Sequence, residues 1–404
     1  MTAPARPSAL TAGLRALPAG IWALGFGSML MDISSELIHS LLPLFMVGVL
    51  GTSLMTVGIV EGVAEATAAF AKVFSGALSD YLGQRKRLVV FGYALAAFSK
   101  PLFPLATSID WVFAARFADR VGKGIRGAPR DALVADLVTP ALRGAAYGLR
   151  QALDSLGAVI GPLLALLFMA WFANDIEAVM WVAVIPAFLT VVLLLRCVQE
   201  PARAESGKDA RPPLRLGDVR RLGRAYWWVA GIGAVFTLAR FSEAFLILRA
   251  EDVGVPLGLV PLALVVMNLF YALCAYPAGR AADRLDARRL LLVSLALLIL
   301  ADLLLAAADD PWLAFVGAAL WGLHMAFSQG LLAKLVADSA PLALRGTAFG
   351  FFNLLGGLAL LAANVIAGAL WQQFGAAVTF LGGAAFATLA ALGLLAWDGR
   401  ARAA

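Results

Sequence analysis

Long apolar stretches recur along the whole of this 404-residue chain and constrain its fold more than any other feature. A helix needs about 20 mostly apolar residues to cross the hydrocarbon core of a bilayer. The sequence holds twelve stretches of roughly that length, and short polar segments separate them. We therefore predict membrane-spanning helices at 19–46, 54–79, 88–108, 110–137, 145–172, 178–197, 225–248, 257–279, 290–307, 312–337, 347–371 and 376–397.

The composition agrees with lipid as the solvent. Hydrophobic residues make up 62% of the chain and charged residues 14%, whereas soluble globular proteins are about half apolar and a quarter charged. The formal net charge of +6 would suggest nucleic acid as the partner of a soluble protein. Here the basic residues lie in short loops between apolar stretches, so we expect the lipid bilayer, and no nucleic acid, as the partner.

The charges of the loops predict the orientation of the chain. Basic residues follow the second, fourth, eighth and tenth predicted spans, whereas Asp175, Glu177, Asp309 and Asp310 lie in alternate loops. Cytoplasmic loops carry an excess of Lys and Arg. We therefore predict a multi-pass protein of the plasma (inner) membrane, with both termini in the cytoplasm and no evident signal peptide. The basic loop residues are Arg85, Lys86, Arg87, Arg143, Arg280, Arg284, Arg288, Arg289 and Arg345.

An internal repeat divides the chain into two related halves. The segment from Gly76 to Lys86 matches the segment from Gly279 to Arg289 at an offset of 203 residues. VADLVTPALRGAAYG matches VADSAPLALRGTAFG at an offset of 202 residues. Two matches in nearly the same register indicate duplicated halves of equal topology, as in transporters that rock around a central site. We predict an all-α membrane protein of two pseudo-symmetric six-helix bundles, 1–198 and 225–404, joined by a polar cytoplasmic linker at 199–224.

Two segments of the first half resemble motifs of the major facilitator superfamily, and the resemblance covers essentially the whole chain. GALSDYLGQRK, from Gly76 to Lys86, is similar to the family's loop motif G-x-L-x-D-R-x-G-R-R/K. Arg116, followed by Gly122 and Gly124, is similar to its motif R-x-x-x-G-x-G, with Arg120 at a position where that motif has glycine. The resemblance implies twelve helices in two bundles that move relative to each other.

The fifth predicted span resembles the family's antiporter motif, G-x8-G-x3-G-P-x-x-G-G. Gly148, Gly157, Gly161 and Pro162 occupy the first positions, and Ala165 and Leu166 replace the final glycines. In the family this motif accompanies exporters that exchange a substrate for protons. Together with the loop motif and its repeat, it implies gating roles for Gly76, Asp80, Gly83, Arg85, Gly279, Asp283, Arg284, Gly148, Gly157, Gly161 and Pro162.

Charged residues inside the predicted spans gather in the first half. A charge at the bilayer centre costs about 2.5–3.5 kcal/mol even on a lenient scale, so these side chains are expected to face one another or a water-filled cavity. On span 4, Lys123, Arg126 and Arg130 lie on one face. Their repeat-equivalent positions in span 10 carry no charge, so the shared scaffold does not require this basic stripe.

Two functional roles fit the buried charges, while mutual neutralisation between helices remains the alternative for any single residue. Carboxyl groups can carry the coupling protons; the candidates are Asp32, Glu36, Glu61, Glu65 and Asp154. The basic stripe suits an anionic or zwitterionic substrate, because guanidinium forks match carboxylate and phosphate. The candidate substrate-binding residues are Arg116, Asp119, Lys123, Arg126, Arg130, Arg150 and Glu243.

The composition of span 4 also allows a local break at a substrate site. It contains Gly122, Gly124, Gly127 and Pro129, and interrupted helices expose backbone groups at transporter sites. In the second half, sparse polar residues such as Arg240 are more simply interpreted as contacts between helices.

These features predict a secondary transporter that moves a small solute by alternating access, as a proton-coupled exporter (antiporter). An importer or exchanger of an organic anion or zwitterion is the alternative, and a non-transporting membrane sensor is a more distant one. The sequence has no H-E-x-x-H, G-x-S-x-G or Walker motif, so neither an enzyme nor an ATP-driven pump is expected. We expect no cofactor and no metal; the partners would be a small-molecule substrate, protons and the bilayer, with the protein as a monomer.

Overall fold

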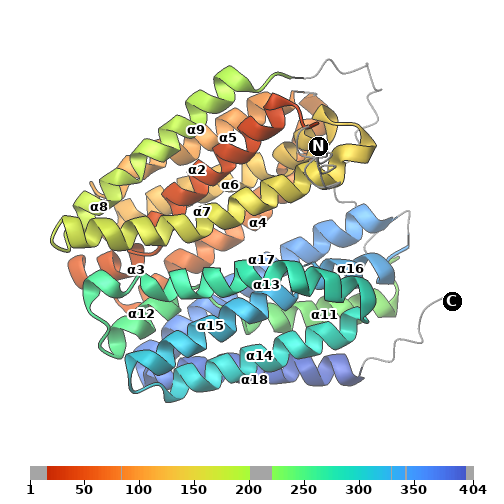
Figure 1. Ribbon diagram of the computed structural model, residues 1–404. Helices are drawn as coiled ribbons and strands as arrows, with labels where there is room; N and C mark the ends of the chain where they lie inside the picture. Colours follow the sequence, from red (N-terminus) through yellow and green to blue (C-terminus); the bar gives the residue numbers. More distant parts are fainter. Residues whose placement is uncertain (1–15, 83, 201–220, 329, 342–343, 397–404) are drawn as a thin grey trace, which may run out of the picture.

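The protein folds into two groups of long helices that lie side by side (Figure 1). The structure is a computed structural model that describes residues 16–82, 84–200, 221–328, 330–341 and 344–396. Residues 16–200 form the N-half, and residues 221–396 form the C-half. The helices of the N-half are α2 Ala19–His39, α3 Leu42–Leu44, η1 Phe45–Val49, α4 Leu54–Leu82, α5 Arg85–Ser99, η2 Lys100–Leu102, α6 Ile109–Leu137, η3 Pro140–Leu142, α7 Arg143–Trp171, α8 Ile176–Val182 and α9 Val184–Cys197. Those of the C-half are α11 Arg224–Leu238, α12 Ala244–Asp252, η4 Leu257–Leu259, α13 Leu262–Arg284, α14 Ala287–Ala307, α15 Pro311–Ser328, α16 Leu331–Ser339, α17 Arg345–Phe374 and α18 Ala376–Ala396.

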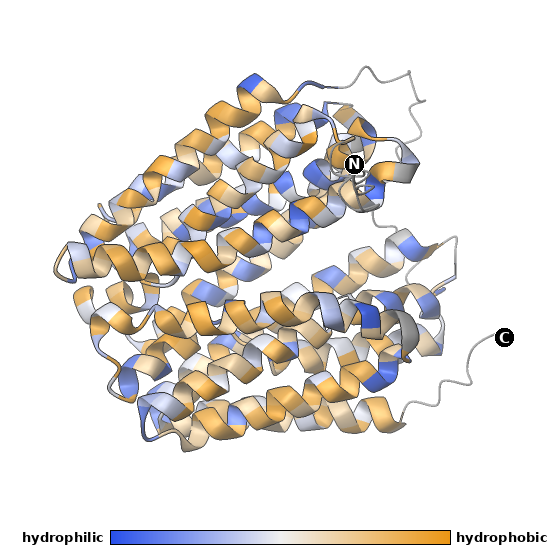
Figure 2. Ribbon diagram, viewed as in Figure 1, coloured by the Kyte–Doolittle hydropathy of each residue, from blue (hydrophilic) through white to orange (hydrophobic). Residues whose placement is uncertain are grey.

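Most predicted spans coincide with long apolar helices. Within the described ranges, nine helical segments are long and apolar enough to cross a membrane. The three other predicted spans are also helical, but α5 and α11 have only 15 residues each, and α6 carries the charged stripe. Figure 2 shows hydrophobic residues along the outer helices α9 and α18, as expected for surfaces that face lipid. The predicted all-α membrane fold is confirmed. Most of the predicted linker, residues 201–220, lies outside the described ranges.

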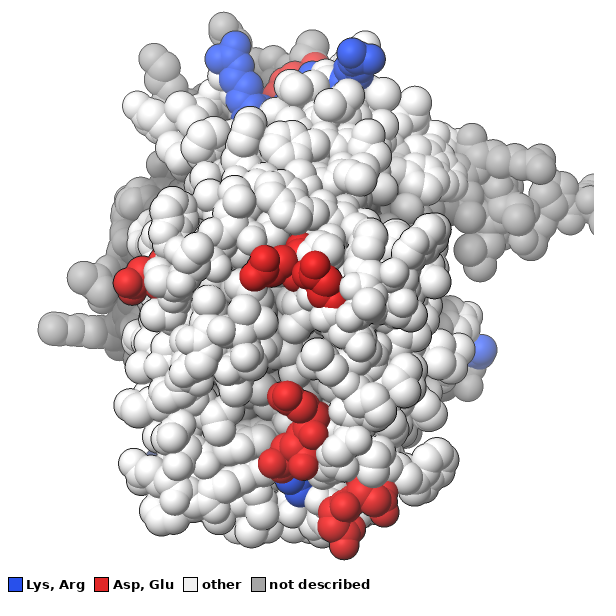
Figure 3. Space-filling view, turned by 90° about the vertical axis from the view of Figure 1, so that its left-hand side faces the viewer, with Lys and Arg blue, Asp and Glu red and all other residues white. Residues whose placement is uncertain are grey.

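The two ends of the bundle differ in charge. Figure 3 looks onto the end where α3, α8 and α12 lie, and acidic side chains gather there. We call it the acidic end; its exposed acidic residues are Asp110, Asp175, Glu177, Glu251, Asp252, Asp309 and Asp310. At the opposite, basic end, Lys86 Nζ donates to the Leu195 carbonyl at 3.1 Å and Arg288 Nη2 to the Leu395 carbonyl at 2.6 Å. These cations lie where the last carbonyl groups of α9 and α18 concentrate negative charge.

The halves touch each other closely near the acidic end. A Cβ atom on Gly58 of α4 would lie 2.3 Å from the Asn364 carbonyl oxygen of α17, and one on Gly368 would lie 2.7 Å from the Leu54 carbonyl oxygen. The Leu54 N–H donates to Gln372 Oε1 at 3.1 Å. Glycines therefore bring the backbones of α4 and α17 into contact, as small residues do between membrane helices.

The first and seventh predicted spans are interrupted at equivalent places. Residues 40–41 separate α2 from α3, and residues 239–243 separate α11 from α12. The repeat offset of 203 residues pairs His39 with Ser242, so the two breaks coincide in the duplicated halves. The backbone N–H of Ser242 donates to Asn364 Oδ1 at 2.7 Å instead of to a helical carbonyl. Side chains can thus replace helical hydrogen bonds where a membrane helix opens.

Helix continuity has two further features, in spans 10 and 4. Span 10 is divided into α15 and α16, and Gly330, which directly precedes α16, has a φ of 75°. Span 4 is not broken, since α6 continues from Ile109 to Leu137 with Pro129 inside it. Its glycines serve close packing instead: a Cβ on Gly122 would lie 2.5 Å from the Gly92 carbonyl oxygen of α5, and one on Gly124 would lie 2.4 Å from Ala71 Cβ of α4.

Candidate functional site

Two cavities lie between the halves, beside the broken helices. The first has a volume of about 320 Å³ and is lined in part by Arg240, Ser242 and Glu243 from the break in span 7. The second has a volume of about 460 Å³ and is lined by residues of α2, α4, α6, α7, α13 and α17. Glu36 and Lys123 line both cavities. The two spaces are therefore adjoining parts of one polar region.

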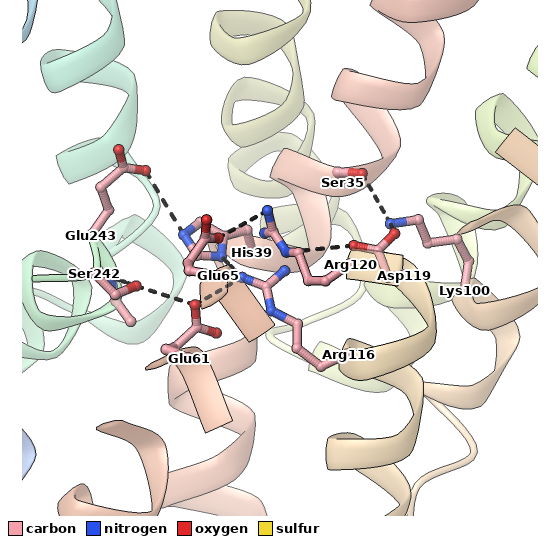
Figure 4. Close-up of polar contacts among 11 residues, drawn as sticks. Ser35, His39, Glu61, Glu65, Lys100, Arg116, Asp119, Arg120, Ser242 and Glu243 are labelled. Carbon is pink, nitrogen blue, oxygen red and sulfur yellow. Dashed lines mark hydrogen bonds and ion pairs between the residues drawn. The ribbon is translucent and has the colours of Figure 1, made fainter. Parts of the chain in front are cut away.

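A chain of buried polar contacts borders the first cavity on the N-half side (Figure 4). Nη2 of Arg116 lies 2.8 Å from Oε2 of Glu61, and Nη1 of Arg120 lies 2.9 Å from Oε1 of Glu65. These contacts join α6 to α4. Oppositely charged groups that pair in this way keep their charges tolerable inside the membrane.

The chain of contacts continues away from the cavity to the end of α5. Nζ of Lys100 lies 2.9 Å from Oδ1 of Asp119, and both side chains are almost completely buried. Lys100 also donates to Ser35 Oγ of α2 at 3.0 Å. Lys100 and Asp119 therefore tie α2, η2 and α6 together and hold the cavity wall in place.

Two contacts cross from the N-half to the C-half at the first cavity. The Ser242 hydroxyl donates to Glu61 Oε2 at 3.2 Å, and His39 Nε2 lies 3.8 Å from Glu243 Oε2. Arg116 Nη2 lies 3.0 Å from His39 Nδ1. Because a guanidinium group only donates, Nδ1 must accept, and the proton of a neutral His39 sits on Nε2 and faces Glu243.

Several charged side chains at the cavities have no ion-pair partner within 4 Å among the described residues. Asp32 and Glu36 lie one turn apart on α2 and line the second cavity. On α6, the exposed Lys123 lies opposite them, and the buried Arg126 stacks its guanidinium carbon 4.4 Å from the centre of the Tyr93 ring. The two carboxyl groups can bind a proton or a cation, and the two basic groups can bind an anion.

A further cluster lies beside the second cavity. Arg150 Nη1 lies 2.8 Å from Asp154 Oδ2, and Arg130 Nη2 lies 4.0 Å from the same oxygen. Arg130 Nη1 also donates to Ser28 Oγ at 2.6 Å and to Tyr93 Oη at 3.1 Å. Asp154 is therefore already neutralised by two arginines.

The structure separates the predicted site residues into two groups. Those that line a cavity are Asp32, Glu36, Glu65, Asp154, Lys123, Arg126, Arg130 and Glu243. Those that line neither cavity are Glu61, Arg116, Asp119 and Arg150. Each of these four is held in an ion pair: Glu61 with Arg116 and Asp119 with Lys100 between helices, and Arg150 with Asp154 one turn along α7. Arg240, Tyr271 and Trp321 line the cavities without having been predicted as site residues.

The predicted gating residues fall at helix contacts and at the basic end. A Cβ on Gly157 of α7 would lie 2.7 Å from the Met29 carbonyl oxygen of α2, and one on Gly161 would lie 2.7 Å from Glu36 Cβ. The glycines of the span 5 motif thus seat α7 directly against the helix that carries Glu36. Pro162 is buried in the same contact region.

The loop motif forms contacts inside the N-half. Arg85 Nη1 lies 2.7 Å from Asp136 Oδ2 at the end of α6, and Gly76 packs α4 near Ala128 of α6. By contrast, a Cβ on Gly148 or Gly279 would meet no atom within 4 Å. Gly83 lies outside the described residues, as do the side chains of Asp80, Asp283 and Arg284. Among the residues that the structure describes, no three His, Cys, Asp or Glu side chains are grouped to hold a metal ion.

Comparison with known proteins identifies the family. A model of the Major Facilitator Superfamily matches residues 24–248 and 234–403. The chain belongs to the major facilitator superfamily. It is similar to an uncharacterized MFS-type transporter of Methanocaldococcus jannaschii, with 32% identity over 94% of this chain and 95% of that protein. It is also similar to the multidrug resistance protein MdtH of Edwardsiella ictaluri, with 26% identity over 89% of this chain and 88% of that protein.

Solved structures of the superfamily have the same fold. The nucleoside transporter NupG matches 93% of this chain and 99% of its own with a TM-score of 0.75 at 15% identity. A bacterial homologue of the human lysosomal transporter Spinster, in an inward-facing and occupied conformation, matches 93% of this chain and 95% of its own with a TM-score of 0.72 at 14% identity. This superfamily member is therefore a multi-pass membrane transporter of small molecules and not an enzyme.

Proposed function

We propose that this superfamily member is a proton-coupled exporter that carries a small solute by alternating access. The observation that carries the proposal is the position of Glu36, which lines both cavities and has no ion pair among the described residues. Such a carboxyl group can hold a proton in one step and a cationic group of the solute in another. The two ligands then compete for one site, and this competition couples their opposite fluxes.

Two further observations support export. Glycines of the span 5 motif press α7 against α2 next to Glu36, so movement of α7 and the state of that carboxyl group are linked. One full-length relative bears the name of a multidrug resistance protein. The acidic residue, the antiporter-type helix and the relative all agree with exchange of a solute for protons.

We propose that the basic end faces the cytoplasm, which would place both termini there and the protein in the inner membrane. Basic loops favour the cytoplasmic side, and the exposed acidic residues lie at the other end. Contact of α4 with α17 near the acidic end would then close the outer side, and the open surroundings of Gly148 and Gly279 would correspond to an inward-open state. We also propose that one chain is enough for transport, so that the protein acts as a monomer.

A second candidate function is the import or exchange of an organic anion or zwitterion. Lys123 and Arg126 favour it, because neither has a carboxylate partner among the described residues although both line the second cavity. The sign of the pH effect separates the two candidates. Protons compete with a cationic group for Glu36, whereas they would assist an anion by neutralising a neighbouring carboxylate.

The proposal is tested in proteoliposomes that contain a pH-sensitive dye. Solutes that raise the melting temperature of the purified protein would be added on one side, with and without an imposed pH gradient. We expect proton movement opposite to the solute, and we expect Glu36→Gln to abolish gradient-driven transport while exchange of labelled for unlabelled solute continues. Loss of both modes, or of neither, would contradict a coupling role. Binding without any flux would instead identify a sensor.

A further inference from the structure

We infer that the first cavity binds a zwitterion, meaning a small solute with one cationic and one anionic group. The inference rests on the proposed function and names the substrate class of its site. It follows from the balance of unpaired charges around the cavity, from their distribution over the two halves, and from an aromatic wall on the C-half side.

Apart from the Arg120–Glu65 ion pair, the first cavity has equal numbers of acidic and basic side chains. Arg120 and Glu65 neutralise each other at 2.9 Å. Of the other charged side chains that the structure describes there, Glu36 and Glu243 are acidic, and Lys123 and Arg240 are basic. Neither Lys123 nor Arg240 has an ion pair within 4 Å in the described ranges, and Glu243 faces only the imidazole of His39, at 3.8 Å.

A solute of one sign would leave half of this set unpaired. An anion would pair with the cations but face Glu36 and Glu243, whereas a cation would pair with the carboxyl groups but face Lys123 and Arg240. A charged group that is buried without a partner is strongly unfavourable. A zwitterion satisfies both sets and carries no net charge into the membrane.

Apart from that ion pair, each half contributes one acidic and one basic side chain to the cavity. Glu36 and Lys123 come from α2 and α6 of the N-half, while Glu243 and Arg240 come from the broken span 7 of the C-half. A zwitterion can therefore hold the halves together by both of its ends. A solute with differential contacts of this kind shifts the equilibrium between two arrangements of the halves.

The cavity also has a place for an apolar body. Trp321 and Phe241 line it, and their ring centres lie 5.4 Å apart. Both side chains are almost buried, at 1% and 5% exposed, so they offer the cavity a small apolar surface. A zwitterion with a compact hydrophobic or aromatic side group fits this surface.

The test uses matched sets of three ligands that share one body, for example phenylalanine, 3-phenylpropanoate and 2-phenylethylamine, and equivalent sets with aliphatic bodies. Affinity for the full-length protein in detergent would be measured by isothermal titration at neutral pH. We expect at least one zwitterion to bind about tenfold or more tightly than both of its single-charge analogues. The inference is overturned if no zwitterion in the panel does so.

Two variants assign the ends of the ligand. Glu36→Gln should weaken binding of the zwitterion and the amine but not of the carboxylate, whereas Lys123→Gln should weaken binding of the zwitterion and the carboxylate but not of the amine. Lys334→Gln, an exposed residue of α16 outside both cavities, is the control for a lost positive charge. Equal losses for all three ligands in either variant would show a general structural defect and contradict the assignment.

Failure of this inference and failure of the proposed function give different results. Binding in detergent needs neither a membrane nor a pH gradient. Zwitterion selectivity without proton-driven flux would leave the substrate class standing and remove the coupling. Proton-driven exchange of a purely cationic solute would support the coupling and rule out the zwitterion as the substrate class.

Discussion

Nη2 of Arg116 lies 2.8 Å from Oε2 of Glu61, and the two side chains are only 2% and 0% exposed. The same carboxylate oxygen accepts a hydrogen bond from Ser242 of the C-half at 3.2 Å. One buried ion pair thus joins α6 to α4 and also reaches the other half. This ion pair borders the first cavity but does not line it. We therefore expect it to affect the stability of the protein more than the binding of a solute.

Breaking this pair on one side should destabilise the protein strongly. Arg116→Gln leaves the Glu61 carboxylate buried without its cation, a change that typically costs about 3–5 kcal/mol. The double variant Arg116→Gln with Glu61→Gln should recover part of that loss, because no charge is stranded. Reversible unfolding in mixed micelles measures both. A single variant as stable as the original protein would show that the pair does not hold these helices.

The contact of α4 with α17 should set the resting state. Gly58→Val places side-chain atoms against the Asn364 carbonyl, which a Cβ alone would approach to 2.3 Å. We expect the acidic end to open and the basic end to close. A cysteine at Gly148, in a background without Cys197 and Cys274, should then react more slowly with a maleimide. Gly48→Val is the matched control, because a Cβ there meets no atom within 4 Å. Unchanged labelling in Gly58→Val would refute the role of this contact.

Arg126 should contribute to solute affinity from the second cavity. Its guanidinium group is buried and stacked on Tyr93, yet has no carboxylate partner in the described ranges. We expect Arg126→Ala to weaken binding of a solute that carries an anionic group by about tenfold, the usual effect of a lost charged hydrogen bond. A cationic analogue is the control ligand. If titration finds the same affinity for both ligands as before, Arg126 lies outside the solute's path.

Solute binding should weaken as the pH falls, because protons and the solute compete for Glu36. If protons displace the cationic group of the solute from Glu36, affinity falls as the pH falls, by up to about tenfold per pH unit for one proton. Glu36→Gln should bind more weakly and lose this dependence, whereas Lys123→Gln should keep it. Titrations between pH 5 and pH 8 measure the slope. Tighter binding at low pH would favour the co-transport of an anion with protons.

The charges of the loops also predict which end faces the cytoplasm. A cysteine at Asp310, exposed at the acidic end, should react in intact cells with a maleimide that cannot cross membranes, and a cysteine at Gly279 should not. Both should react after the membrane is made permeable. The reverse pattern would invert the proposed orientation and with it the direction of transport.

The sequence carried enough information for the fold because helix length, loop charge and an internal repeat are all local signals. It did not predict the breaks in spans 1, 7 and 10. The break at residues 239–243 depends on Asn364, which is 122 residues away in the chain and accepts the freed N–H of Ser242. The sequence pattern of span 7 alone does not show that a residue so far along the chain accepts this hydrogen bond.

The site was predicted only in part, for a related reason. A charge inside a span signals that a partner or a cavity exists, but not which of the two. Asp119 and Lys123 lie one turn apart on α6, yet Asp119 faces Lys100 whereas Lys123 lines the cavities. Lys100 could have been noticed as the one basic residue near the end of span 3. Trp321 gave no signal, because aromatic residues are common in membrane helices.

Alternating access is tested most directly by measuring distances at both ends of the same protein. Spin labels would be placed on Gly148 and Gly279 near the basic end and, in a second sample, on Val49 and Leu259, which are exposed near the acidic end. Pulsed electron resonance in liposomes would follow both pairs as pH and solute are varied. We expect the two distances to change in opposite directions, with Glu36→Gln removing the response to pH but not the response to solute. Distances that stay fixed, or that change together, would contradict a carrier that opens its two sides in turn.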